Sequence, residues 1–119
     1  MTTPDAPAGS CLVAFTTAPS AEAARALVGA LVERRLVACG TVVPGATSVY
    51  RWQGAVEQQD EVLVVLKTTA ARWPELAAAL PGLHPYEVPE LVAVPVVGGH
   101  PAYLQWVGEA TAQPGTRKE

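Results

Sequence analysis

The chain has 119 residues, of which 50% are hydrophobic and 16% are charged, and its net charge at pH 7 is −3. This length and composition indicate one globular domain, near the size at which contacts between subunits often add stability. The pI of about 5.3 excludes a basic footprint for DNA or RNA, and two cysteines are too few for a disulfide scaffold.

The two ends of the chain have the composition of tails. Residues 1–10 are rich in Thr, Pro, Ala and Gly, so we expect a disordered N-terminal tail, a single domain over 11–112 and a C-terminal tail over 113–119. The N-terminal segment lacks the cationic and apolar regions of a signal peptide, and the apolar runs are of strand length. We therefore expect a cytoplasmic protein without membrane or nucleic-acid partners, with its cysteines reduced.

A strand and an amphipathic helix are predicted first. The apolar run CLVAFTTA (11–18) is typical of a strand and is closed by Pro19. Ser20 is a suitable N-cap for a helix that reaches about Leu36, with Glu22 favourably placed in its first turn. Apolar residues at helical spacing give this helix one buried stripe: Ala24, Leu27, Val28 and Leu31.

A long β-hairpin is predicted next. Residues 37–52 are extended, and Pro44-Gly45 interrupts them as a bend or bulge. Gln53-Gly54 is typical of a turn, after which residues 55–69 return as the antiparallel partner. The hairpin is long for so small a domain.

The remaining elements are a helix, a strand and a short terminal helix. Pro74 is tolerated in the first turn of the helix, and Gly82 is expected just past its end. The last strand is predicted over 88–97 and the terminal helix over 102–112. The apolar stripe of the second helix comprises Trp73, Leu76, Ala77 and Leu80.

This order predicts an α+β, ferredoxin-like βαββαβ sandwich with an extra C-terminal helix. In that plan the first and third strands are central, so strands two and four are open edges that another element or chain must cover. Aromatic residues, which are enriched at buried interfaces, lie in or near those edges: Tyr50, Trp52, Tyr103 and Trp106. We infer an oligomer that seals the edges.

His84, in the proline-bounded segment GLHPYEVPELVAVPV (82–96), is the sharpest candidate for chemistry. It stands where a loop meets a strand, and a neutral imidazole suits copper or zinc. The alternative is a histidine that hydrogen-bonds the backbone and packs under Pro85. The residues alone favour this alternative, because no second ligand lies at the spacing of a metal motif.

The two cysteines have different expected roles. Cys39 follows the first helix and begins a strand, where it is either a small buried hydrophobe or a thiolate ligand for a soft metal. Cys11 begins an interior strand, and we assign it to the core. Because strands one and two are not neighbours in the predicted sheet, no disulfide between them is expected.

Several charged residues are candidates for other ligands. Lys67 ends the apolar run VLVVL, and a lysine there either reaches water or, in a cleft, attracts a carboxylate or phosphate. Glu87 and Glu90 are candidate ligands for a hard cation, although two glutamates three apart are common at strand ends. Asp60 and Glu61 are expected to be solvated charges of the hairpin.

The motifs of common enzymes do not occur in the chain. There is no Gly-x-Ser-x-Gly elbow, no phosphate-binding GxxxxGK[ST] and no dinucleotide-binding GxGxxG. A nucleophile pair of Cys39 and His84 has no local support. We therefore expect a binding protein rather than an enzyme.

The chain resembles the CutA family of divalent-cation tolerance proteins over about residues 11–108. The likeness rests on four strings in order: LVERRLVACGTVVPGATSVYRWQGAVE, EVLVVLKT, LHPYEVPEL and YLQWV. Within them, PGATSVYRWQG and HPYEVPE are distinctive together. The resemblance implies a ferredoxin-like subunit in a compact homotrimer whose long hairpins pair between subunits, which is an independent answer to the open edges.

The resemblance also implies a relation to copper or another divalent cation. The ligands that it implies include the histidine of the HPY string, here His84, and a cysteine just before the Thr-Ala-Pro string. Thr16 stands at that second position, and a hydroxyl is a poor ligand for copper. Cys39 matches a cysteine typical of the family and is the other candidate metal ligand.

The predicted fold and trimer are also similar to the nitrogen-regulatory PII signalling proteins, which bind nucleotides and metabolites in clefts between subunits. This similarity gives an alternative function, a sensor or scaffold that binds a small anion near His84. The candidate cleft residues are Lys67, Tyr86, Glu90 and Trp52. A third hypothesis is a structural trimer on which partner proteins dock. Thermal melting with metals and with nucleotides would separate the three.

Overall fold

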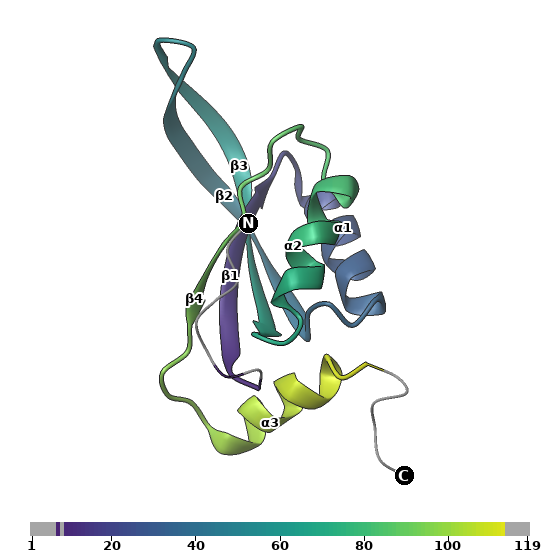
Figure 1. Cartoon of the computed structure of the whole chain (residues 1–119). Helices are drawn as coiled ribbons and strands as arrows, with labels where there is room; N and C mark the ends of the chain where they lie inside the picture. The colour runs from purple at the N-terminus through teal and green to yellow at the C-terminus, as the bar shows by residue number, and fades with distance from the viewer. Residues whose placement is uncertain (1–6, 8, 114–119) are drawn as a thin grey trace.

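The computed structural model describes residues 7 and 9–113 (Figure 1). Within them the elements follow the predicted order: β1 (Cys11–Ala18), α1 (Ala21–Glu33), β2 (Cys39–Trp52), β3 (Ala55–Thr69), α2 (Trp73–Leu83), β4 (Val92–Pro95) and α3 (Pro101–Ala110). The predicted tails, 1–10 and 113–119, lie mostly outside the described residues. None of the described helices is long and apolar enough to cross a membrane.

The strands form one antiparallel sheet in the order β2-β3-β1-β4, which confirms the ferredoxin-like α+β fold. As predicted, β1 and β3 are central, and β2 and β4 are the edges. Helices α1 and α2 lie side by side over one face of the sheet, and α3 lies across one end of the molecule (Figure 1). The far end of the β2–β3 hairpin projects beyond the helices.

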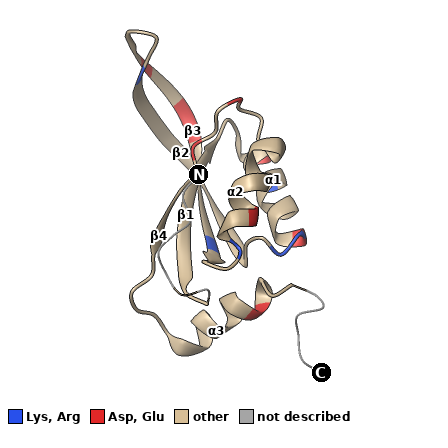
Figure 2. Ribbon diagram, in the orientation of Figure 1, with Lys and Arg blue, Asp and Glu red and all other residues tan. Residues whose placement is uncertain are grey.

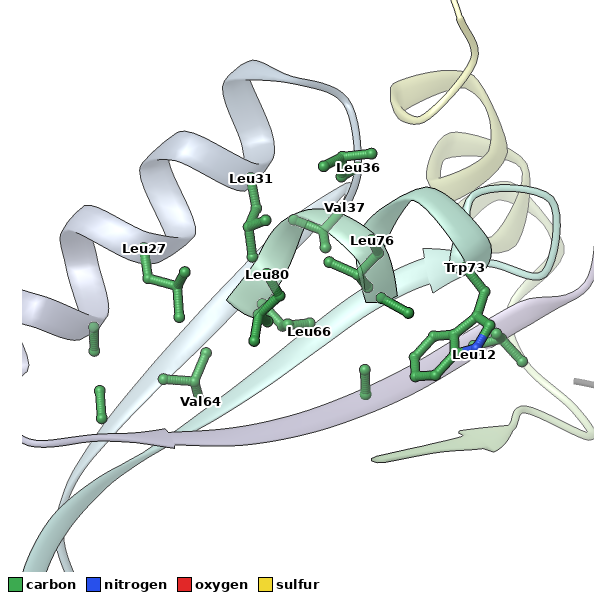
Figure 3. Close-up of a cluster of buried hydrophobic side chains, with 14 of the residues drawn as sticks. Leu12, Leu27, Leu31, Leu36, Val37, Val64, Leu66, Trp73, Leu76 and Leu80 are labelled. Carbon is green, nitrogen blue, oxygen red and sulfur yellow. The ribbon is translucent and has the colours of Figure 1, made fainter. Parts of the chain in front are cut away.

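The main core lies between the sheet and helices α1 and α2 (Figure 3). Alternation along β1 directs Leu12 and Ala14 to this face, where they are 1% and 0% exposed. Burying a large aliphatic side chain contributes roughly 1.5–3 kcal/mol to the stability of the fold. The apolar side chains that the sheet and the two helices bury against each other therefore hold the layers together. Other members of the core are Leu27, Leu31, Leu36, Val37, Val64, Leu66, Trp73, Leu76 and Leu80.

The opposite face of the sheet is apolar and largely uncovered. On β4, Val92 and Val94 are 53% and 48% exposed, and they pair with Phe15 and Val13 of β1. Only one end of this face, among the described residues, is covered by a helix, where Val107 of α3 packs in a small second cluster. This surface, together with the two sheet edges, is what the predicted oligomer would bury.

A β-bulge at Pro44-Gly45 decides which side chains of the hairpin share a face. Val43 pairs with Leu63, but the next pair is Ala46 with Glu61, so β2 holds one extra residue. Before the bulge the odd-numbered residues of β2 share a face with Leu63; after it the even-numbered residues share a face with Glu61. Gly45, with φ of 88°, supplies the left-handed backbone that the bulge uses.

The tip of the hairpin is a two-residue turn, as the sequence predicts. Gln53 and Gly54 both have positive φ, 50° and 83°, which matches the right-handed twist of the flanking strands. The strands near the tip are exposed on both faces, with Val49 and Val56 at 63% and 67%. The fold of a single chain leaves this part of the hairpin without a core.

Helix α1 begins as predicted and ends earlier than predicted. The Ser20 hydroxyl accepts the backbone N–H of Ala23 at 3.1 Å, which confirms the N-cap. The helix stops at Glu33 rather than at Leu36, because Arg35 takes a left-handed conformation with φ of 58° and the N–H of Leu36 reaches back to the carbonyl of Leu31 at 3.0 Å.

Two predicted boundaries later in the chain are wrong. Helix α2 runs to Leu83, so Gly82 lies inside the helix and not beyond it. The strand predicted over 88–97 is limited to β4, because its pairing with β1 runs only from Val92 to Pro95. After Pro95 the N–H of Val96 still donates to the carbonyl of Cys11 at 3.0 Å, but Cys11 is the first residue of β1, and residues 84–91 form a loop.

Candidate functional site

His84 directly follows α2, and its ring is fixed by two hydrogen bonds. Nδ1 accepts the backbone N–H of Tyr86 at 3.0 Å, so the proton of a neutral ring lies on Nε2, which donates to the carbonyl of Thr17 at 2.7 Å. The side chain is buried, and its ring centroid lies 4.9 Å from that of Tyr86. The imidazole therefore ties the loop after α2 to the end of β1.

Tyr86 brings this loop onto the hairpin. Its hydroxyl donates to Oε2 of Glu61 at 2.8 Å, and Nε2 of Gln59 donates to the same hydroxyl over a longer 3.4 Å. Gln59 in turn accepts the hydroxyl of Tyr50 at 2.9 Å. Burial, and then the hydrogen bond and negative charge of Glu61, raise the pKa of Tyr86 to about 12.

Glu61 is a buried carboxylate, and the prediction of a solvated charge is wrong. Its side chain is only 9% exposed, because the loop after α2 folds over it. Burial raises its pKa, but hydrogen bonds from Ser48, Tyr86 and Thr17 outweigh burial, so that the pKa of Glu61 lies below its ordinary value. At neutral pH Glu61 is therefore ionised inside a polar network.

These residues line a groove of about 550 Å³ between the hairpin and the loop after α2. Three of the predicted cleft residues, Trp52, Tyr86 and Glu90, meet there. The groove is also lined by Thr17, Tyr50, Gln59, Glu61, Pro85, Glu87 and Val88. None of the lining residues is basic, and Figure 2 shows acidic positions on the hairpin and on the loop after α2.

Lys67 and Cys39 lie outside the groove. They are opposite each other in the sheet, Cys39 on β2 and Lys67 on β3. The Cys39 thiol contacts the hydroxyl of Tyr103 at 3.7 Å. That contact, followed by burial, raises the pKa of Tyr103. Burial raises the pKa of the Cys11 thiol nearby, and both cysteines are free, as expected.

The structure does not bring the two candidate metal ligands together. Cys39 is level with Val13 in the sheet, whereas His84 binds the carbonyl of Thr17, four residues further along β1. At about 3.3 Å per residue, this offset alone is about 13 Å. Within the described residues no group of three or more His, Cys, Asp and Glu side chains is placed to hold a metal ion.

Thr16, at the position where the resemblance implies a cysteine, points into the core beside Ala14 and Ala18. It is 0% exposed, and its hydroxyl has no hydrogen-bond partner among the described residues. It follows Phe15 and precedes Thr17, so its side chain lies on the face of β1 opposite to the groove.

Two features of the structure were missed by sequence reasoning. Glu61, Gln59 and Tyr50 were not identified as parts of one network, although strand alternation places them on one face once the bulge is counted. Arg72 was missed altogether: its guanidinium donates to the carbonyls of Arg34 and Arg35 and pairs with Glu75, which joins the end of α1 to the start of α2. Only the network had a visible signal, because Pro44-Gly45 marks the bulge that sets its register.

Comparison with known proteins gives a consistent result. The family model of the CutA1 divalent ion tolerance protein matches residues 12–110. The divalent-cation tolerance protein CutA of Thermus thermophilus is 50% identical over 99 residues, covering 83% of this chain and 96% of that protein. The human protein CutA is 43% identical over 103 residues, covering 87% of this chain but 58% of the human protein.

The fold comparison agrees with the sequence comparison. The crystal structure of CutA from Xylella fastidiosa is 39% identical in sequence, with a TM-score of 0.84 that covers 87% of this chain and 99% of that one. The family match over residues 12–110 runs from β1 to α3 and includes the long hairpin.

Proposed function

Because this chain belongs to the CutA1 divalent ion tolerance family, we propose that it acts by binding a divalent metal ion, with copper as the candidate, rather than by catalysis. The observation that carries the proposal is the assembly of His84, Tyr86 and the ionised Glu61 beside the groove. Imidazole and carboxylate are both ligands for divalent metals. Tyr86 links the two groups, because its backbone N–H donates to Nδ1 of His84 and its hydroxyl donates to Glu61.

Metal coordination by His84 requires a local rearrangement. Since Nδ1 accepts the amide of Tyr86 and Nε2 donates to Thr17, one of these hydrogen bonds must open before the ring offers a lone pair. A typical hydrogen bond of this kind contributes about 1 kcal/mol, so a metal that binds imidazole well can offset the loss. We expect the loop after α2 to move when the metal binds.

Cys39 would serve a separate site. Its distance from His84 along the sheet excludes a shared ion in one subunit, and its immediate contact is Tyr103. We propose Cys39 as a thiolate ligand for a soft metal only in combination with groups from a second copy of the chain. His84 likewise needs ligands from a second copy, because the described residues of one chain bring no three ligating side chains together at either place.

We propose a homotrimer as the functional assembly. The uncovered apolar face of the sheet, with Val92 and Val94, and the two open edges are the supporting observations. The groove lies on the same face, since Thr17 and Glu61 share that face with Phe15 and Leu63. An assembly that covers the face would therefore place the groove at a boundary between subunits.

The anion-binding alternative receives no support from the groove. Its lining includes Glu61, Glu87 and Glu90 but no basic residue, and Lys67 lies toward the far end of β3. An anion would be repelled by these carboxylates. A cytoplasmic location stays a prediction, and the two free cysteines fit a reducing compartment.

The test is a calorimetric titration of the metal-free, reduced protein with copper. Saturation near one ion per subunit is expected, with loss of that binding in His84→Ala and retention in His100→Ala, which removes the other histidine of the chain. Equal binding by both variants would assign the metal to other groups. The absence of saturable binding in the wild type would contradict the proposal.

A further inference from the structure

The groove beside the hairpin has a lining with one sign of charge. Glu61, Glu87 and Glu90 line it, and no lysine, arginine or histidine does. Glu61 is buried and ionised, while Glu87 and Glu90 are exposed on the loop after α2. Low-dielectric walls lined by one sign of charge favour a ligand of the opposite sign. The groove is therefore suited to a cation.

Three further residues of the lining are aromatic. Tyr50 and Trp52 come from β2, and Tyr86 comes from the loop after α2. The bulge at Pro44-Gly45 sets the two β2 residues on the same face as Glu61. Gln59 contacts both tyrosine hydroxyls, at 2.9 Å and 3.4 Å, and so fixes the two phenol groups relative to each other.

This combination is suited to an organic cation. Aromatic faces attract ammonium and guanidinium groups through their π-electrons and also bury the methyl or methylene groups that such ligands carry. The volume of about 550 Å³ is in the range of sites for small molecules.

We propose that the groove between the hairpin and the loop after α2 binds a small organic cation, with an ammonium group held against Tyr50, Trp52 and Tyr86 and balanced by Glu87 and Glu90. This site goes beyond metal binding and does not depend on it. His84 does not line the groove, although Glu61 and Tyr86 contribute to both proposals. Loss of copper binding in His84→Ala and loss of choline binding in Glu87→Gln/Glu90→Gln therefore report on the two proposals separately.

The test compares choline with its uncharged isostere 3,3-dimethylbutan-1-ol, each titrated into the full-length protein by calorimetry and by tryptophan fluorescence. Saturable binding of choline is expected, with binding of the alcohol about tenfold weaker or absent, because only the cation gains from the aromatic faces and carboxylates. Equal binding of both compounds would mean that the groove binds them only through apolar contacts, and this would overturn the proposal. The absence of saturation with choline would overturn it as well.

Matched variants locate the bound cation. Trp52→Ala and the double variant Glu87→Gln/Glu90→Gln are each expected to weaken choline binding about tenfold, while Trp52→Phe retains part of it. The controls are Trp106→Ala and Glu33→Gln, which alter an exposed tryptophan and an exposed glutamate outside the groove. Loss of binding in the controls equal to that in the groove variants would place the cation elsewhere. The oligomeric state of each variant is measured alongside, so that a change in assembly is distinguished from a loss of contacts.

Discussion

Thr16 and Thr68 lie on the core face of the two central strands and differ in one hydrogen bond. The Thr68 hydroxyl donates to the carbonyl of Leu36 at 2.7 Å, whereas the Thr16 hydroxyl has no partner among the described residues. A buried hydroxyl without a partner loses its hydration and gains nothing in return. Thr16 is therefore a local cost to stability in a well-filled core.

We predict opposite effects for the same substitution at these two positions. Thr16→Val removes an unpaired hydroxyl and is expected to raise the free energy of unfolding by about 1 kcal/mol, while Thr68→Val is expected to lower it by about 1–2 kcal/mol. Urea denaturation at a fixed protein concentration measures both. A Thr16→Val variant that is as unstable as Thr68→Val would mean that the Thr16 hydroxyl is paired in solution.

Because Tyr86 donates a hydrogen bond to Glu61, removal of its hydroxyl is predicted to lower the free energy of unfolding by an amount that depends on pH. Because the pKa of folded Glu61 is lowered, its stabilising effect is present above the pKa of the unfolded chain and is lost as the pH falls through the folded value. Tyr86→Phe removes the donor, so it should cost about 1.5–3 kcal/mol at pH 7 and progressively less in acid. Urea denaturation across the acidic range gives the profile.

Tyr50→Phe is the control for this prediction, because it removes a hydroxyl that binds the neutral Gln59 rather than a carboxylate. Its penalty should be small and independent of pH. If Tyr86→Phe showed the same cost at every pH, the hydrogen bond to Glu61 would not be the source of the effect.

At this scale the sequence allowed only part of the site to be predicted. The two readings of His84 could be stated in advance, but its actual partners, Thr17 and the Tyr86 amide, depend on how the loop after α2 folds back. The burial of Glu61 depends on the same loop. Contacts between residues far apart in sequence leave no periodic signal, whereas strand alternation does.

At the scale of elements, the approach of α1 to β2 depends on a glycine. A methyl group at Gly40 would lie 2.7 Å and 2.8 Å from the methyls of Val28 and 3.0 Å from Leu66. Side chains in a filled core cannot yield such space without strain. Gly40 therefore sets how closely the first helix sits on the sheet.

We predict that Gly40→Ala lowers the free energy of unfolding by about 1–3 kcal/mol through overpacking. Gly29→Ala is the matched control: nothing lies within 4 Å of its added methyl, and alanine in place of glycine inside α1 should stabilise by up to about 1 kcal/mol. Thermal and urea denaturation compare the two. A neutral Gly40→Ala would show that α1 can shift on the sheet without cost.

The elements that could be predicted are those with long, regular patterns. The boundaries of β1 and β3 agree with the prediction, and so do the bulge and turn of the hairpin, because local chemistry decides them. The length of β4 could not be predicted, because the residues before Val92 leave β1 and form the loop that His84 and Tyr86 attach to β1 and to the hairpin. The early end of α1 depends on Arg35 in a left-handed conformation, which favours glycine or asparagine.

At the scale of the whole molecule, a single chain leaves one apolar face of the sheet largely uncovered. Val94 is 48% exposed on that face, and Val32 is 41% exposed on the outer side of α1. The first lies where the proposed trimer forms and the second does not. The two valines thus form a matched pair for a test of assembly.

Light scattering coupled to size-exclusion chromatography should give a trimer for the wild type and for Val32→Glu. Val94→Glu is expected to shift the population to monomers, because a carboxylate buried in an apolar interface costs several kcal/mol. Dissociation of both variants, or of neither, would place the interface on another surface.

The fold of the whole chain could be predicted from the order of its elements, and so could the existence of open edges. The separation of Cys39 from His84 could not, because it follows from the register of three strands, which is known only after pairing. The acidic character of the groove likewise depends on which charges the bulge and the loop after α2 bring together.

The bulge at Pro44-Gly45 also has a consequence for how this hairpin can evolve. A single-codon deletion there would remove the extra residue and make β2 regular, while Val43 would still pair with Leu63 and Ala46 with Glu61. Tyr50 and Trp52 would therefore stay on the face of Glu61. A second one-residue deletion from β2 would shift the register and exchange the two faces of the strand. Related hairpins that keep these side chains together should therefore be able to lose one residue at this position but not two.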